Sequence, residues 1–284
     1  MKIAILTDTN SGIMSQEADK LSVFVMPMPF FIDGQLYFEG INLTQEEFFE
    51  KQASGAEIST SMPSPADVMD KWDELLKSHD QVIYLPMSSG LSSSCSTAVS
   101  LAQDYEGKVF VVDNKRISVP LRESVYNAME LVEKGYDGAE IKRILEEDAL
   151  NAQVFITVST LKYLQKGGRV TSAAALIGTA LNIKPILNID GGKLDAFAKV
   201  RGMKQAEQKL LDAAHSELDR YAGEDCLIRV AYSGDPELGQ KWIDKVAEAF
   251  PGYEVYGDPL GLSIACHTGP GAYGITWACM AGDT

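Results

Sequence analysis

The sequence predicts an α/β protein, in which a parallel-sheet N-terminal domain is followed by a second, α+β domain with a mostly antiparallel sheet. In the first half, continuous apolar runs end at polar residues, which is typical of parallel strands that helices cover on both faces. These runs are Ile3–Thr7, Val82–Pro86 and Val109–Val112. Helix-start signals lie between them, which predicts a β-α-β order. In the second half, a hairpin signal and single helices between strands predict the antiparallel sheet.

Three helix starts in the first half are marked by capping residues. Thr44 and Glu47 form a capping-box pattern, Ser64 is an N-cap candidate followed by a proline, and Asp137 opens another helix. Ligands of parallel α/β sheets bind at the carboxyl ends of the strands. The polar residues that follow the predicted strands are therefore candidate binding residues: Asp8, Ser88–Ser92 and Asp113.

The second half has a different order of elements. Asp190-Gly191-Gly192 lies between two apolar runs and predicts a hairpin. The expected elements are, in order, strand Val154–Val158, helices Leu161–Lys166 and Ser172–Leu181, strands Ile186–Ile189 and Leu194–Lys199, helix Lys204–Tyr221, strand Leu227–Tyr232, helix Glu237–Phe250, and strands Tyr253–Tyr256, Ser263–Cys266 and Ile275–Cys279. We therefore expect two domains, 1–152 and 153–284, with a ligand in the second domain that lies between or adjoins the two.

The composition excludes several classes of partner. The chain has 284 residues, of which 45% are hydrophobic, and its 25 basic and 40 acidic residues give a formal charge of −15. A strongly acidic surface repels phosphate backbones and anionic lipids, so neither nucleic acid nor a membrane surface is an expected partner. No segment reaches the ~18 apolar residues that a membrane span needs. The run Met1–Asp8 is too short for a signal peptide and predicts a strand. We expect a cytoplasmic protein.

The cysteines do not suggest a disulfide framework or a metal site. Cys95, Cys226, Cys266 and Cys279 form no C-x-x-C pair, and none lies near a second His at ligand spacing. A chain of this length needs no disulfide to fold, so we expect reduced thiols in or near the core. The sequence also lacks H-E-x-x-H, calcium-loop and P-loop patterns. We expect no metal and no cofactor.

Two hydroxyl-rich loops are candidate anion sites. Thr60 and Ser61 precede the helix that Ser64 opens, and they could present hydroxyls and backbone N–H groups to an anion. The alternative is that they are ordinary loop and capping hydroxyls. Ser92 lies in a second loop between a buried strand and a helix, which is also a ready anion site. Its alternative role is to cap that helix.

The remaining candidates are cationic or imidazole side chains. Arg169 follows two glycines at a helix end, where it either contacts an anionic group or is solvated at the negative end of the helix. Arg201 follows a strand and has the same two interpretations. His267 precedes a glycine-rich loop and could donate to an anion, although a lone His is more often structural. The glycines of that loop match G-x-G-x-x-G literally, but a strand-like segment follows in place of a helix, so we reject a dinucleotide site.

Taken in order, these motifs resemble the DegV family of bacterial fatty-acid-binding proteins, whose members include the binding subunits of fatty acid kinase. The resemblance covers the whole chain and rests on six motifs: Thr7-Asp8-Thr9, Thr60–Ser64, Ser88–Ser92, Val111–Asp113, Leu161–Arg169 and His267–Gly271. It implies a two-domain protein that buries one acyl chain between or within its domains. The chain departs from the family at Met62, where Gln is usual, and at Ser93-Ser94-Cys95, where Gly-Thr-Tyr is usual.

The resemblance also implies roles for individual residues. The carboxylate of the fatty acid would be held by the loop of Thr60 and Ser61, by Ser92 and by His267. Arg169 and Arg201 would lie near the head group and favour an acyl-phosphate. In the family a separate kinase subunit phosphorylates the bound acid. This chain would therefore present the substrate and would not itself be an enzyme.

The physical chemistry of a fatty acid agrees with this set of residues. Burying methylenes contributes ~0.8 kcal/mol each, so a long acyl chain gains on the order of 12 kcal/mol before ordering costs. The apolar segment Ala173–Leu181 offers a wall for such a chain. The buried carboxylate must be hydrogen-bonded, and Thr60, Ser92 and His267 can supply donors, His267 more strongly if protonated.

We therefore predict a cytoplasmic protein that binds a long-chain fatty acid, has no catalytic residues, and carries the acid and its acyl-phosphate for a kinase partner. One alternative is a serine hydrolase or esterase that uses Ser92, His267 and either Asp8 or Asp113. The missing second glycine of the G-x-S-x-G elbow argues against it. Another alternative is a module that binds a sugar or a small acid and has no apolar tunnel.

Overall fold

The structure is a computed structural model that describes residues 1–169, 182–219 and 226–279. The chain divides into two compact units, Met1–Leu150 (unit 1) and Asn151–Thr284 (unit 2). Unit 1 contains a parallel sheet and unit 2 a mostly antiparallel one, so the predicted fold class is confirmed. The helix predicted at Ser172–Leu181 lies outside the described residues.

Unit 1 is built on a four-stranded parallel sheet in the order β2-β1-β6-β7. Its strands are β1 (Ile3–Asp8), β2 (Phe24–Met26), β6 (Gln81–Leu85) and β7 (Val109–Val111). The strands β1 and β6 are almost entirely buried, as expected where helices cover both faces of a sheet. Because β1 pairs with β2 on one side and β6 on the other, the strand order reverses at β1 and β6. The carboxyl ends of these two strands are where such folds bind ligands.

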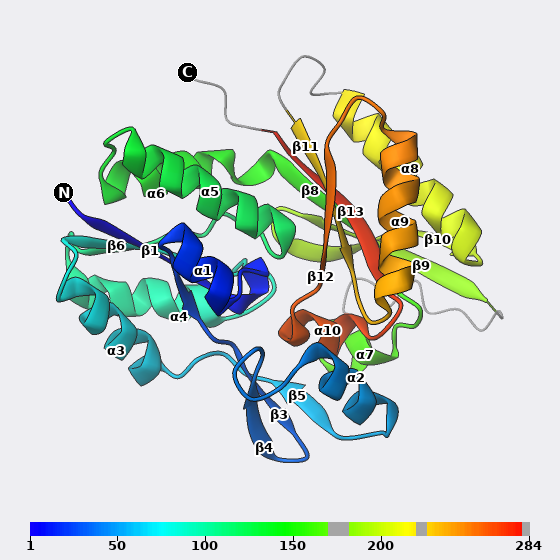
Figure 1. Cartoon of the computed structure of the whole chain (residues 1–284), viewed down its shortest axis with the longest axis horizontal. Helices are drawn as coiled ribbons and strands as arrows, with labels where there is room; N and C mark the ends of the chain where they lie inside the picture. The colour runs from blue at the N-terminus through cyan, green and yellow to red at the C-terminus, as the bar shows by residue number, and fades with distance from the viewer. Residues whose placement is uncertain (170–181, 220–225, 280–284) are drawn as a thin grey trace. The chain divides into compact units, whose positions relative to one another are not determined.

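Six α-helices surround the sheets of unit 1 (Figure 1). They are α1 (Ser15–Leu21), α2 (Gln45–Ala53), α3 (Pro65–Leu76), α4 (Ser94–Leu101), α5 (Val119–Glu133) and α6 (Gly138–Glu147). The predicted caps are confirmed, because Thr44 and Asp137 each form a capping box and the Ser64 hydroxyl accepts from the Asp67 N–H. The helices α3 and α4 cover one face of the parallel sheet, where Trp72 packs edge-on against Tyr84.

A small antiparallel sheet in unit 1 is not predicted by the sequence. It has the order β4-β3-β5, with β3 at Pro29–Ile32, β4 at Gln35–Phe38 and β5 at Ile58–Thr60. Strands this short carry no clear periodicity. At the edge of β4 the side-chain amide of Asn42 accepts from the Phe38 N–H (2.7 Å) and donates to the Leu36 carbonyl (3.5 Å). Asn42 therefore occupies hydrogen-bonding groups that a further strand would need.

Unit 2 is built on a six-stranded sheet in the order β10-β9-β8-β13-β11-β12. Its strands are β8 (Ala152–Thr157), β9 (Ile183–Asp190), β10 (Lys193–Arg201), β11 (Cys226–Tyr232), β12 (Val255–Pro259) and β13 (Tyr273–Cys279). Among the described strands of unit 2, only β11 and β12 pair in parallel. The hairpin between β9 and β10 is confirmed, since Gly191 and Gly192 both have positive φ angles.

Four helices are described in unit 2: α7 (Lys162–Lys166), α8 (Met203–Leu218), α9 (Pro236–Ala249) and α10 (Leu262–Thr268). Leu210 and Ala214 of α8 and Trp242 and Val246 of α9 pack in the main core with the sheet. The strand predicted at Ser263–Cys266 is wrong, because this segment forms α10. A short apolar run does not distinguish strand from helix.

The cysteine prediction is also wrong in part. Cys226 is disulfide-bonded, and in the pairing of β11 with β13 it lies opposite Cys279. Cys95 and Cys266 are free thiols. In the parts of the chain that the structure describes, no helix is both long enough and apolar enough to cross a membrane.

Candidate functional site

Asp8 lies at the carboxyl end of β1, where the sheet of unit 1 reverses its order. Its buried carboxylate accepts hydrogen bonds from the backbone N–H groups of Met87 (2.9 Å) and Asn10 (2.9 Å). Burial raises the pKa of Asp8 to about 6, although these hydrogen bonds lower it. Asp8 therefore joins the chain after β1 to the chain after β6.

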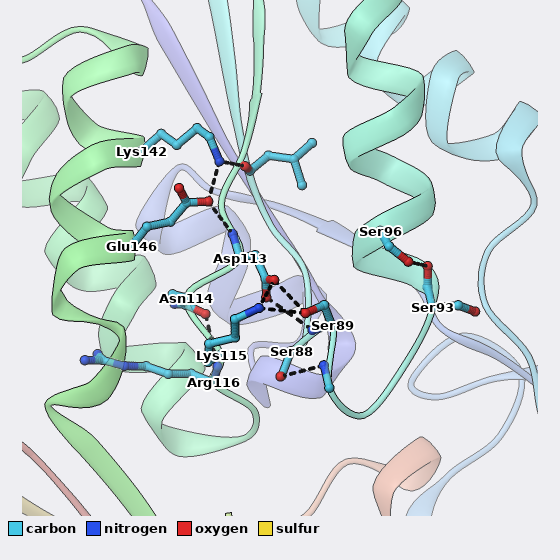
Figure 2. A network of polar contacts seen from close by, with 12 residues as sticks. Ser88, Ser89, Ser93, Ser96, Asp113, Asn114, Lys115, Arg116, Lys142 and Glu146 are labelled. Carbon is cyan, nitrogen blue, oxygen red and sulfur yellow. Dashed lines mark hydrogen bonds and ion pairs between the residues drawn. The ribbon is translucent and has the colours of Figure 1, made fainter. Parts of the chain in front are cut away.

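A second carboxylate, Asp113, anchors the loop that leads to Ser92 (Figure 2). Asp113 accepts from the Ser89 hydroxyl (2.6 Å) and from the Ser89 N–H (3.2 Å). Lys115 pairs with Asp113 and donates to the Ser89 hydroxyl (2.8 Å). Partial burial raises the pKa of Asp113, but the hydrogen bonds from Lys115 and Ser89 outweigh it and hold this pKa below its ordinary value. Asp113 is thus an ionised group that fixes the start of the loop.

Helix α6 lies beside the same strand end and contacts it through Lys142 and Glu146 (Figure 2). The Glu146 carboxylate accepts from the Asp113 N–H (3.0 Å), and Lys142 both pairs with Glu146 and donates to the Val111 carbonyl (2.7 Å). Lys115 has a positive φ of 59°, which is uncommon for a residue with a side chain. The sequence does not reveal this support, because Lys115, Lys142 and Glu146 look like ordinary surface charges.

Ser92 is half-buried, and its contacts within unit 1 are local. Its hydroxyl accepts from the Ser94 N–H in the first turn of α4 (3.2 Å), and its own N–H donates to the Ser88 carbonyl (3.2 Å). The Asp8 and Asp113 carboxylates are bonded to other groups. In the described part of unit 1, Ser92 therefore forms no nucleophile–base pair with either aspartate.

The loop of Thr60 and Ser61 is joined to the Ser92 loop within unit 1. Thr60 ends β5, and Ser61 uses its N–H to bond the Pro29 carbonyl (3.1 Å) and its hydroxyl to bond the Met62 carbonyl (3.1 Å). The Ser61 N–H is therefore already used inside the protein. Met62 makes the connection, because its sulfur accepts from the hydroxyls of two residues that follow Ser92: Ser93 (3.6 Å) and Thr97 (3.7 Å).

His267 lies in the last turn of α10 in unit 2, against the backbone of Gly167. A Cβ atom at Gly167 would come within 2.0 Å of His267 Nδ1, so only glycine allows this approach. Burial and, to a lesser degree, the charge of Arg169 lower the pKa of His267 to about 4. The imidazole is therefore neutral near pH 7, and not the protonated donor that would bind an anion most strongly.

The glycines of two sequence motifs bring α7 and α10 together. A Cβ atom at Gly269 would lie 2.2 Å from the Tyr163 ring, and both Gly269 and Gly271 have positive φ angles. The Ser159 hydroxyl donates to the Gly271 carbonyl (3.1 Å). The motifs around Gly167 and His267 are thus one packed structure, although they are far apart in the sequence.

The two candidate arginines lie in different surroundings. Arg169 is exposed, donates to the Gly167 carbonyl (2.5 Å) and is close enough to affect His267. Arg201 is exposed at the end of β10, and its N–H donates to the Gln205 side chain (3.0 Å). In the described part of unit 2, Arg169 therefore lies near enough to act electrostatically on His267, whereas the contact described for Arg201 is with Gln205. The wall expected at Ala173–Leu181 lies outside the described residues.

Comparison with known proteins gives one consistent result. Residues 2–279 match the family model described as "Uncharacterised protein, DegV family". A DegV domain-containing protein of Deinococcus radiodurans is 32% identical, over 97% of this chain and 98% of its own. The structure of a DegV family protein from Thermus thermophilus, described by its fatty acid binding, has a TM-score of 0.89 and 33% identity and covers 99% of this chain and 100% of its own. DegV of Bacillus subtilis, described as a fatty acid binding protein, has a TM-score of 0.87 and 28% identity, with coverage of 98% and 99%.

Proposed function

Because the chain belongs to the DegV family, we propose that it binds one long-chain fatty acid, whose carboxylate contacts Thr60, Ser61, Ser92 and His267. The observation that carries this proposal is the likeness, over nearly the full length, to the two structures from Thermus thermophilus and Bacillus subtilis that are described as binding fatty acid. The apolar chain would supply most of the binding free energy, and the polar residues would select the head group.

The order of the candidate loops in unit 1 and the protonation state of His267 in unit 2 both support a carboxylate ligand. In unit 1 the Thr60 and Ser92 loops are tied by Met62, so their hydroxyls need little further ordering when they bind. In unit 2 the neutral imidazole of His267 can donate one N–H to a carboxylate. A hydrogen bond to a charged group contributes about 1.5–3 kcal/mol, so these donors together are sufficient to favour an acid over an alcohol.

The proposal includes a role in presenting the acid to a separate kinase. Arg169 and Arg201 are both exposed cations, and a guanidinium suits a phosphate better than an ammonium does. We expect the loaded protein with ATP alone to form no acyl-phosphate, and to form it when a kinase is added. Trapping with hydroxylamine measures this. An acyl-hydroxamate formed by the purified protein and ATP alone would contradict a carrier role.

Identification of the ligand that co-purifies with the protein is the direct test of acyl binding. The native protein is purified, denatured and extracted with organic solvent, and the released species are identified by mass spectrometry. We expect about one fatty acid per chain, or the same stoichiometry after a delipidated sample is given a long-chain acid. A polar ligand, or failure to bind added acid, would contradict the proposal.

Paired substitutions test the head-group residues. Thr60→Val together with Ser92→Ala removes two hydroxyls, and we expect affinity for the acid to fall about tenfold or more. The matched control is Ser96→Ala with Ser100→Ala, which removes two hydroxyls from the exposed side of α4. Unchanged affinity in the folded Thr60/Ser92 variant, or an equal loss in the control, would refute the assignment.

A further inference from the structure

A groove of about 650 Å³ opens on unit 1 between α3 and the small sheet. Most of its lining is apolar and comes from the chain before and within β3, from β4, and from the loop before α3: Met26, Pro27, Pro29, Phe31, Leu36, Phe38, Met62, Pro63 and Pro65. Leu36 in this groove is 42% exposed, and it lies among other apolar residues of the lining. The groove thus leaves apolar surface open to water within a single unit.

The rim of the groove along α3 is acidic. Asp67, Asp70 and Glu74 line the groove, and their spacing places them along one side of the helix. The one cation of the lining, Lys71, is paired with Glu74 (3.0 Å) and lies over the Phe24 ring. The rim therefore keeps a net negative charge, which disfavours a fatty acid head group or an anionic lipid and favours a cationic occupant.

The edge of β4 indicates whether a strand or a helix would bind in the groove. Asn42 already bonds the Phe38 N–H and the Leu36 carbonyl, so an added strand would have to displace it. A helix needs no backbone partners and can lay its apolar side chains in a groove. Helix α3 has 12 residues and is therefore ~18 Å long, which corresponds to about three turns of a helix beside it.

We propose that this groove is a docking surface for an amphipathic helix of a partner protein, with apolar residues on one face and Lys or Arg beside them. The apolar face would cover Leu36 and Met62, and the cations would lie along Asp67 and Asp70. One wall of the groove is the loop Ser61–Pro65, so the partner would rest against the chain that directly follows Thr60. The docking surface belongs to unit 1 alone, and its lining includes Ser61, one of the proposed head-group residues.

The test uses the full-length protein and a fluorescein-labelled peptide of about 14 residues, in which Leu repeats at helical spacing and Lys occupies the flanking positions. Fluorescence anisotropy measures binding. Because a protein of charge −15 attracts any cationic peptide, two matched peptides are needed. One has Ser in place of Leu, and the other has Glu in place of Lys. Leu36→Ser and Asp70→Lys change the groove, and Asp19→Lys makes the same charge change on the exposed side of α1.

We expect the Leu/Lys peptide to bind and both matched peptides to bind at least tenfold more weakly. Leu36→Ser and Asp70→Lys should each reduce affinity about three- to tenfold, and Asp19→Lys should leave it nearly unchanged. An equal loss with Asp19→Lys, or no loss with Leu36→Ser, would overturn the proposal. So would a shift of the unmodified protein from dimer to monomer on Leu36→Ser, since a second copy would then be the occupant. Loss of fatty acid binding in the folded Leu36→Ser variant would assign the groove to the acyl chain and overturn it too.

Discussion

The contact between Gly167 and His267 allows a sharp prediction. Gly167 has an ordinary helical φ of −80°, so Gly167→Ala introduces no backbone strain. The new methyl group would lie 2.0 Å from His267 Nδ1, whereas carbon atoms in contact are separated by about 3.5–4.0 Å. The imidazole must therefore move by about 1.5 Å or more.

The expected size of the effect follows from that displacement. A hydrogen bond from His267 to a carboxylate, lengthened by about 1.5 Å, is lost. A hydrogen bond to a charged group contributes about 1.5–3 kcal/mol, so affinity for a fatty acid should fall about ten- to a hundredfold. Crowding in a packed region should also reduce the free energy of unfolding by about 1–3 kcal/mol.

Competition with a fluorescent fatty acid measures the affinity, and urea unfolding measures the stability. Gly252→Ala is the matched control, because Gly252 also lies in unit 2, lacks a positive φ, and has open space where a Cβ atom would be. We expect the control to bind like the unmodified protein. Gly168→Ala is not suitable, since Gly168 has a positive φ of 71°.

A double-mutant cycle separates an effect through His267 from general damage. If Gly167→Ala acts by moving the imidazole, it should change affinity little in a His267→Ala background. A folded Gly167→Ala variant with normal affinity would refute the reasoning. An equally large loss in the His267→Ala background would show that Gly167 matters for another reason.

Three further predictions concern stability and the joined loops. The pKa of His267 is about 4 in the folded protein and 6.5 in a model peptide, so the unfolded chain binds more protons between these values. His267 therefore makes the free energy of unfolding fall as pH falls from about 6.5 to 4, and His267→Gln should flatten that part of the profile. Asp148→Ala removes the carboxylate that pairs with the buried Arg116 guanidinium at 2.8 Å. This should lower the free energy of unfolding in urea by about 3–5 kcal/mol, so a cost near zero would contradict a buried ion pair. Met62→Leu keeps the side-chain volume but removes the sulfur acceptor, so we expect less than about 1.5 kcal/mol of destabilisation and a few-fold weaker acyl binding, and unchanged binding would show that the sulfur does not order the loops.

Much of the fold could be predicted because its signals are local. The capping boxes at Thr44 and Asp137 and the glycine pair Gly191-Gly192 each specify one turn of backbone. The small sheet could not be predicted, since its strands have three or four residues and depend on pairing with distant segments. The segment Ser263–Cys266 is predicted as a strand but lies in α10, because a short apolar run does not distinguish strand from helix.

The sequence indicates which residues are candidates for the site, but it does not indicate which groups they contact. The hydroxyl of Ser92 stands out in a loop after a strand, that of Thr60 stands out before a helix, and His267 stands out beside glycines. What the sequence could not supply is the partner of each group. No local sequence pattern indicates that the Met62 sulfur accepts hydrogen bonds from two hydroxyls, or that Gly167 leaves room for the His267 imidazole. Such contacts join segments that are distant in sequence. They determine the protonation state of His267 and the conformational order of the Thr60 and Ser92 loops.

The position of β13 in the sheet of unit 2 has a consequence for how the protein is made. This strand is the last of the described strands along the chain, yet it lies between β8 and β11 and contributes Ile275 and Trp277 to the core. During synthesis, β8 to β10 and β11 to β12 emerge before β13, which joins them in the sheet of the described residues. Unit 1 can fold as a completed domain while unit 2 waits on the ribosome with open sheet edges. The edges of β8 and β11 that β13 covers therefore stay unpaired until this strand has emerged.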